Sequence, residues 1–169
     1  LPLPRITYDE AMERYGSDKP DTRFGFELHS LNIKAKDSPF PVFADAISSG
    51  GDVRAINING HSADFSRKDL DKLQDEIKAY GAKGLAWIRV GDNEITSSFN
   101  KFYDKEGLYA LAEELEGKPG DLILIVAGKP QVVFDSLGYL RREIANRLGM
   151  LDDKTYNLLW VVDFPLLEY

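Results

Sequence analysis

Apolar residues recur at two spacings along this chain, and the two spacings alternate through its middle part. Three segments repeat apolar residues every three or four positions, as one face of an amphipathic helix does: 66–81, 104–117 and 130–148. Between them lie runs rich in Val, Ile and Leu, which predict strands at 53–58, 84–90 and 121–127. This order predicts an α+β fold, a two-layer sandwich in which a small mixed or antiparallel sheet carries helices on one face.

The apolar helix faces and strands together predict one compact core. Its expected members are Ile56, Ile58, Leu70, Leu73, Ile77, Leu85, Trp87, Leu111, Leu115, Leu122, Leu124, Val126, Leu140 and Ile144. Capping residues support the helix ends: Ser66 is a good N-cap with Asp69 at the third helical position, and Gly81 closes that helix.

The first part of the chain has a different pattern. Thr7 and Glu10 have the Thr-x-x-Glu spacing of a capping box, which predicts a helix from Tyr8 to about Tyr15 that stops at Gly16. A polar loop, Ser17–Arg23, follows. Beyond it, alternating apolar residues predict a short strand at 24–28, and a polar segment at 34–41 predicts a second loop.

Both ends of the chain also depart from the pattern of the middle. Residues 158–169 are an apolar and aromatic run, which predicts a buried strand with neighbours on both faces. Residues 1–5 contain no initiator methionine and lead straight into a helix. We therefore expect a piece of a larger protein, with flanks at 1–33 and 151–169 around an inserted domain at 34–150.

Composition narrows the classes of function. With 43% hydrophobic and 29% charged residues, the chain is globular in type, and no apolar stretch reaches the length of about 18–20 residues that a membrane span needs. The absence of cysteine excludes disulfides and thiolate metal sites, and it fits a reducing cytosol. A net charge of −7 argues against broad, sequence-independent binding of nucleic acid.

Residues that could carry chemistry are few. His29 and His61 both lie beside predicted turns, where a solvated loop residue is a simpler interpretation than a general base or a metal ligand. The segments 81–84 and 117–120 resemble phosphate loops, but they follow helices and precede strands, so helix C-caps explain them. Trp87 lies in an apolar strand and is expected to pack in the core.

Several segments nevertheless resemble one known family. The N-terminal segment 3–24, which contains Gly-Ser-Asp-Lys-Pro-Asp, and the segment 159–165 resemble parts of the catalytic domain of bacterial aspartyl-tRNA synthetases. Between them, residues 81–88, residues 120–127 and the pair Leu140-Arg141 are similar to the GAD domain, an insertion typical of these enzymes. The resemblance covers nearly the whole chain.

The resemblance implies a parent enzyme that activates aspartate with ATP and Mg²⁺ and transfers it to the terminal ribose of its tRNA. Such a parent is a cytoplasmic homodimer. None of the class II sequence motifs lies in these 169 residues, so no catalytic, cofactor-binding or metal-binding residue is assigned to this chain. We expect the fragment alone to be inactive and to hold no cofactor.

The expected partners are the rest of the synthetase chain and tRNA(Asp), with no membrane. RNA contact by the fragment itself is expected to be weak at most. Its candidate is an exposed loop at 92–101, whose polar residues include Asn93, Ser97, Ser98, Asn100 and Lys101.

Two alternatives remain at this stage: a GAD-type module of a glutamyl-tRNA(Gln) amidotransferase subunit, and a free-standing interaction domain. The segments 16–24 and 160–165 resemble synthetases rather than amidotransferases.

Overall fold

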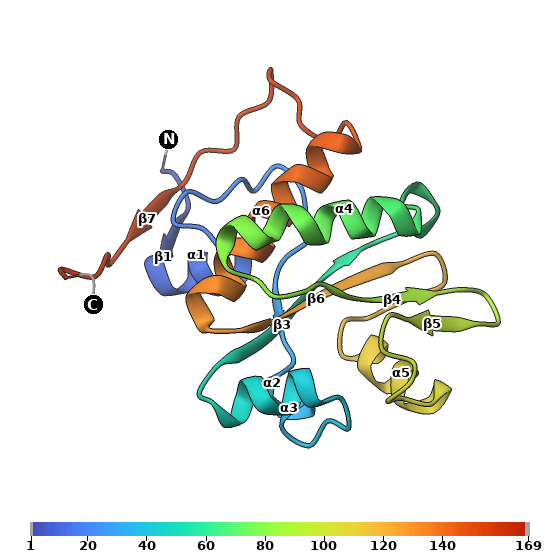
Figure 1. Ribbon diagram of the computed structural model, residues 1–169. Helices are drawn as coiled ribbons and strands as arrows, with labels where there is room; N and C mark the ends of the chain where they lie inside the picture. Colours follow the sequence, from blue (N-terminus) through green and yellow to red (C-terminus); the bar gives the residue numbers. More distant parts are fainter. Residues whose placement is uncertain (1, 168–169) are drawn as a thin grey trace.

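An antiparallel sheet of five strands lies at the centre of the protein, in a computed structural model that describes residues 2–167 (Figure 1). In spatial order the strands are β2 (His29–Ser30), β3 (Asp52–Ile58), β6 (Leu122–Gly128), β4 (Ala86–Val90) and β5 (Ile95–Ser97). The longest pairing joins β3 to β6, from Asp52 opposite Gly128 to Ile58 opposite Leu122. This ladder lies inside the sheet, with further strands on both sides.

The central strand β6 is apolar on both of its faces. Leu122, Leu124 and Val126 lie on one face, Ile123 and Ile125 lie on the other, and none of the five is more than 1% exposed. Alternate residues of a strand point to opposite sides of a sheet, so a continuous apolar run needs cover on both sides.

Helices supply that cover on both faces of the sheet. One face carries α4 (Arg67–Ile77) and α6 (Pro130–Arg147), and the opposite face carries α2 (Asn32–Lys36), α3 (Pro41–Ser48) and α5 (Lys105–Glu113) (Figure 1). The predicted α+β class and antiparallel sheet are confirmed. The expected two layers are corrected to three, because β3 and β6 bury apolar side chains on both sides of the sheet.

The single predicted core is accordingly divided by the sheet into two clusters. Leu111 and Leu115 belong to the cluster under α5, and the other predicted core residues belong to the cluster under α4 and α6. Trp87 packs against the latter cluster but is only partly buried.

The helix α4 forms as its sequence predicts. The Ser66 hydroxyl accepts a hydrogen bond from the Asp69 amide at 3.1 Å, and the Asp69 carboxylate accepts one from the Ser66 amide at 2.7 Å. This capping box satisfies backbone donors that α4 would otherwise leave unpaired. After a 3₁₀ turn, Gly81 ends the segment with φ +92°, a conformation that favours glycine.

Other local predictions fail where tertiary contacts decide the backbone. Residues 24–28 form no strand, although Phe24, Phe26 and Leu28 are buried, because Phe26 has φ +58°. The loop predicted at 34–41 instead holds most of α2 and the first residue of α3. The bounds predicted for the inserted domain, 34–150, stay a prediction.

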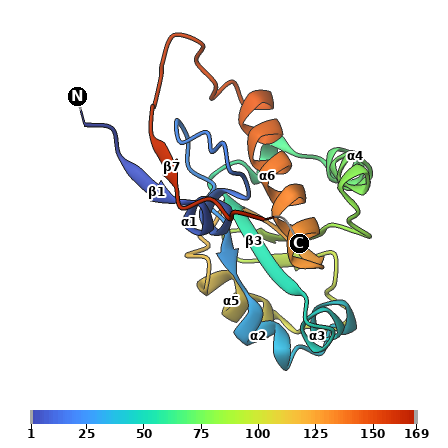
Figure 2. The same ribbon diagram turned by 90° about the vertical axis from the view of Figure 1, so that its left-hand side faces the viewer.

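The two flanks lie side by side. β1 (Arg5–Thr7) leads into α1 (Tyr8–Tyr15), and it pairs in parallel with β7 (Trp160–Val162) in a separate sheet of two strands (Figure 2). The helix predicted over 8–15 is confirmed. Within 158–167, the described part of the predicted run, only this short strand forms, and Trp160 is 58% exposed rather than buried. Residues 1, 168 and 169 lie outside the described part of the chain.

Among residues 2–167, no helix combines the length and the apolar composition that crossing a membrane requires.

The double-sided burial predicts large losses of stability from core truncation on the α4 and α6 face. Leu73 and Leu124 are both fully buried, so Leu73→Ala and Leu124→Ala should each lower the free energy of unfolding by about 2–5 kcal/mol. Ile33 is 90% exposed, so the control Ile33→Ala should change it by less than about 0.5 kcal/mol. Urea titrations followed by circular dichroism measure all three. Equal stabilities of the core variants and the control would contradict the assigned faces.

Candidate functional site

The loop Ser17–Arg23, singled out in the sequence, begins where α1 touches α6. Gly16 ends α1 with φ +66°, and its amide donates to the Met12 carbonyl at 2.8 Å. A Cβ at Gly16 would lie 2.5 Å from the Phe134 carbonyl oxygen, and one at Gly138 would lie 2.5 Å from the Gly16 carbonyl oxygen. The two backbones therefore meet without intervening side chains, which only glycine permits at both positions.

Arg141 of α6 holds the far end of this loop. It is 1% exposed, and its guanidinium carbon lies 4.7 Å from the Tyr15 ring centre and 4.3 Å from that of Phe24. Its two terminal nitrogens donate to the carbonyl oxygens of Asp21, Phe24 and Gly25 at 2.7–2.9 Å. Burial lowers the pKa of Arg141 to about 10, so the group still carries its charge at neutral pH.

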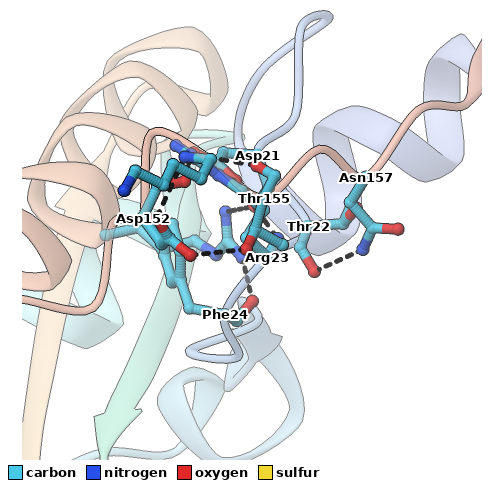
Figure 3. A network of polar contacts seen from close by, with 9 residues as sticks. Asp21, Thr22, Arg23, Phe24, Asp152, Thr155 and Asn157 are labelled. Atoms are coloured by element: carbon cyan, nitrogen blue, oxygen red, sulfur yellow. Dashed lines mark hydrogen bonds and ion pairs between the residues drawn. The ribbon is translucent and has the colours of Figure 1, made fainter.

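The same loop also binds the C-terminal flank (Figure 3). Arg23 pairs with the Asp21 carboxylate at 2.6 Å and donates to the Asp152 carbonyl at 2.8 Å. Asn157 donates to the Thr22 carbonyl at 3.0 Å. Hydrogen bonds from Arg23 lower the pKa of the Asp21 carboxyl, which keeps this pair charged. The chain thus leaves the N-terminal flank and returns to the C-terminal flank at one place.

A groove of about 560 Å³ runs along α6 beside this junction. Tyr139 lines it and donates its hydroxyl proton to Glu76 of α4 at 2.8 Å, and Glu76 also pairs with Arg147 at 2.7 Å. Burial, together with the hydrogen bond to Glu76, raises the pKa of Tyr139 to about 12. Tyr139 therefore stays protonated at neutral pH and ties α4 to α6.

The contacts around the loop Ser17–Arg23 fix it to α6 and to the C-terminal flank, because the charged groups there bond to one another and to backbone carbonyls. The histidines lie elsewhere: His29 is exposed in β2, and His61 contacts Asp64 at 2.7 Å. Within residues 2–167, no group of three or more His, Asp or Glu side chains is placed to hold a metal ion. The absence of catalytic, cofactor-binding and metal-binding residues stays a prediction.

The loop proposed for RNA contact, 92–101, differs from the expectation of an exposed connection. Its centre is the edge strand β5, where Ile95 and Ser97 are buried, and Phe99 just beyond it is 2% exposed. Ser97 turns inward and accepts a hydrogen bond from the Phe99 amide at 3.2 Å. Asn93, Ser98, Asn100 and Lys101 remain exposed.

The contact between Gly16 and Gly138 predicts an unusual response to alanine. Alanine in the middle of a helix normally stabilises it by up to about 1 kcal/mol relative to glycine. Gly138→Ala should instead lower the free energy of unfolding by about 1–3 kcal/mol, because the new Cβ meets fixed backbone. Gly25→Ala is the control, since nothing lies within 4 Å of its Cβ position. Thermal and urea unfolding measure both, and a stabilised Gly138→Ala variant would refute the close approach.

Arg141 should be required for the loop to keep its place. Arg141→Leu leaves three carbonyls without their donor and should lower the free energy of unfolding by about 3 kcal/mol. Arg142→Leu, at the exposed neighbouring position, should change it by less than about 0.5 kcal/mol. Limited proteolysis should cut the Arg141→Leu protein within residues 17–25 faster than the control. Equal cutting of the two variants would mean that other contacts hold the loop.

Comparison with known proteins agrees with this architecture. The chain is 54% identical over 170 aligned residues to an aspartate–tRNA(Asp/Asn) ligase of Lachnoclostridium phytofermentans, a match that covers 100% of this chain and 28% of the relative. It is 49% identical to an aspartate–tRNA ligase of Halalkalibacterium halodurans and 50% identical to an aspartate–tRNA(Asp/Asn) ligase of Bacillus cereus, with 28% of each relative covered.

The chain thus spans little more than a quarter of the length of these curated relatives. A family model described as the GAD domain matches residues 43–137, which run from α3 into the first half of α6. That match covers more than half of the sequence, and the chain belongs to the GAD domain family.

Proposed function

We propose that this chain is the non-catalytic insertion (GAD) domain of a bacterial aspartate–tRNA ligase, together with short flanks of its catalytic domain. The observation that carries the proposal is the meeting of the two flanks. β1 pairs with β7, and Arg23 bonds to the Asp152 carbonyl, so the middle part leaves and rejoins the flanks at one place. An insertion needs this arrangement, because the host domain must continue without a gap.

The extent of the sequence similarity supports the same assignment. The match to the Lachnoclostridium phytofermentans ligase covers both flanks as well as the middle. A GAD module of an amidotransferase subunit would share the middle, but its flanks would differ. We therefore favour the synthetase over the amidotransferase and over a free-standing interaction domain.

In the intact enzyme we assign this unit a supporting role. The proposed parent attaches aspartate to tRNA with ATP and Mg²⁺, works in the cytoplasm as a homodimer and carries its catalytic groups outside this chain. Exposed apolar side chains on and around β7 are available for contact with the rest of that enzyme: Leu158, Trp160, Phe164, Leu166 and Leu167. The insertion would contribute to the placement of tRNA or to the shape of the enzyme.

The bounds of the inserted unit, residues 34–150, are also a proposal. β2 and Leu31 lie just before the first bound, and both join the central sheet and its second core. For an experiment, residues 24–151 are the better segment to remove, because Arg23 and Asp152 on its two sides already touch.

These assignments predict two opposite results for aspartate-dependent ATP–pyrophosphate exchange. This chain alone should show none. A chimera in which it replaces the matching segment of the Lachnoclostridium phytofermentans ligase should retain exchange. Exchange should also survive in that chimera when a short Gly/Ser linker replaces residues 24–151.

Exchange by the isolated chain, in a preparation free of host synthetase, would overturn the non-catalytic assignment. Loss of exchange in the excised chimera, despite native circular dichroism and the same oligomeric state, would place part of the catalytic machinery within residues 24–151.

A further inference from the structure

Trp87 of β4, the strand next to the edge strand β5, lies beside two arginine side chains on the sheet face that carries α4. The guanidinium carbon of Arg67, the first residue of α4, is 5.7 Å from the indole ring centre, and that of Arg89 is 5.5 Å from it. Trp87 is only partly buried, and Arg67 is exposed. Cation–π attraction explains how the three side chains gather, but it leaves both positive charges without a counterion.

No carboxylate neutralises this pair in the described structure. The arginines that form ion pairs within residues 2–167 are Arg14, Arg23, Arg54 and Arg147. Burial lowers the pKa of Arg89, and the nearby charge of Arg67 lowers it further, as expected for two cations at close range. Two uncompensated positive charges on a protein of net charge −7 mark a place for an anion.

The surroundings of the pair are fixed and polar. Arg89 donates to the backbone carbonyls of Ser62 and Phe65, each at 2.6 Å, and so holds the segment that leads into α4. The Arg67 side chain is exposed and has no hydrogen-bonded partner among the described residues, so its donors are available. The site is therefore organised before any ligand arrives, which reduces the entropy lost on binding.

The sheet continues from this cluster into a narrow strip of hydroxyl groups. Thr96 of β5 lies opposite Arg89 in the register, and Ser98 exchanges hydrogen bonds of 3.0 Å with Trp87 through its hydroxyl and its amide. β5 is the last strand of the sheet, so the strip ends at the surface. Hydroxyls beside a guanidinium suit phosphate oxygens and ribose hydroxyls.

We propose that Arg67, Trp87 and Arg89 form a contact site for the RNA backbone, which tRNA occupies in the intact enzyme. Arg67 donates to a phosphodiester, Arg89 adds to the positive potential, and the exposed part of the indole packs on the adjoining sugar or base. This inference rests on the proposed function, because it takes the parent to act on tRNA. An acidic protein segment fits the charges but gives the ring edge and the hydroxyl strip no partner, so RNA is favoured.

The first test uses the chimeric ligase described above and measures aminoacylation of tRNA(Asp). Arg67→Gln should raise KM for tRNA about fivefold and Arg67→Glu more, while tRNA-independent ATP–pyrophosphate exchange stays unchanged. The slope of log KM for tRNA against log salt concentration should fall by about 1, which corresponds to the loss of one phosphate contact. Lys36→Gln and Lys36→Glu are matched controls, since Lys36 is exposed on α2 across the sheet, and they should leave KM unchanged.

The second test uses this chain with Trp160→Phe, so that Trp87 is its only indole. Added tRNA should change the Trp87 fluorescence in a saturable way, with weak affinity that falls as salt rises, and Arg67→Glu should abolish the change. Inorganic phosphate is added separately. A full response to phosphate alone would reduce the site to a simple anion site and overturn the RNA assignment.

The outcomes separate this inference from the function on which it rests. An unmodified chimera that charges no tRNA contradicts the proposed function. A chimera that charges tRNA, with KM for tRNA unaffected by Arg67→Glu, contradicts the contact site alone. Equal losses of exchange and aminoacylation in Arg67→Glu would also contradict the contact site, because loss of a tRNA contact leaves tRNA-independent exchange intact.

Discussion

The ladder between β3 and β6 buries apolar side chains on both of its faces, and the rest of the structure depends on that burial. Each fully buried Leu or Ile contributes about 1.5–3 kcal/mol, so leaving either face open to water would remove most of the stability of a small domain. The sequence must therefore supply helices to both faces. It does so with α4 and α6 on one side and with α2, α3 and α5 on the other.

At one end of this ladder, a buried carboxylate ties the loops together. Asp121 accepts hydrogen bonds from the Asn57 side chain at 3.0 Å, the Gly60 amide at 2.8 Å and the Lys118 amide at 2.9 Å. On the flank side, Arg141 and the contact of Gly16 with Gly138 have the same function for α1 and α6. In both places, a buried charged side chain bonds to backbone groups of neighbouring loops, which fixes the position of each loop.

Sequence patterns predicted the elements whose signals are local. The capping box at Ser66 and Asp69, the glycine after α4 and the apolar run of β6 all act within a few residues of the chain. The helices α2 and α3 were missed because neither has a side-chain cap, and exposed Ile33 and Val42 break their apolar periodicity.

The site shows the same division between local and distant signals. The loop Ser17–Arg23 stood out, but its main partner, Arg141, lies 120 residues beyond Asp21, and no local pattern predicts that pairing. Trp87 was assigned to the core because its strand is apolar. Its place in β4, one strand in from the edge of the sheet and beside two arginines, follows from the strand order, which the sequence does not reveal.

The parallel pairing of β1 with β7 also has a consequence for the order of folding. Arg23 bonds to a carbonyl 129 residues further along, and closing an unstructured loop of that length costs about 4 kcal/mol in chain entropy. Two strands of three residues cannot offset such a loss. Once the middle part has folded, Arg23 and Asp152 are neighbours already, and most of this entropic barrier is gone. Loop entropy therefore favours an order in which the central sheet forms before the flanks pair.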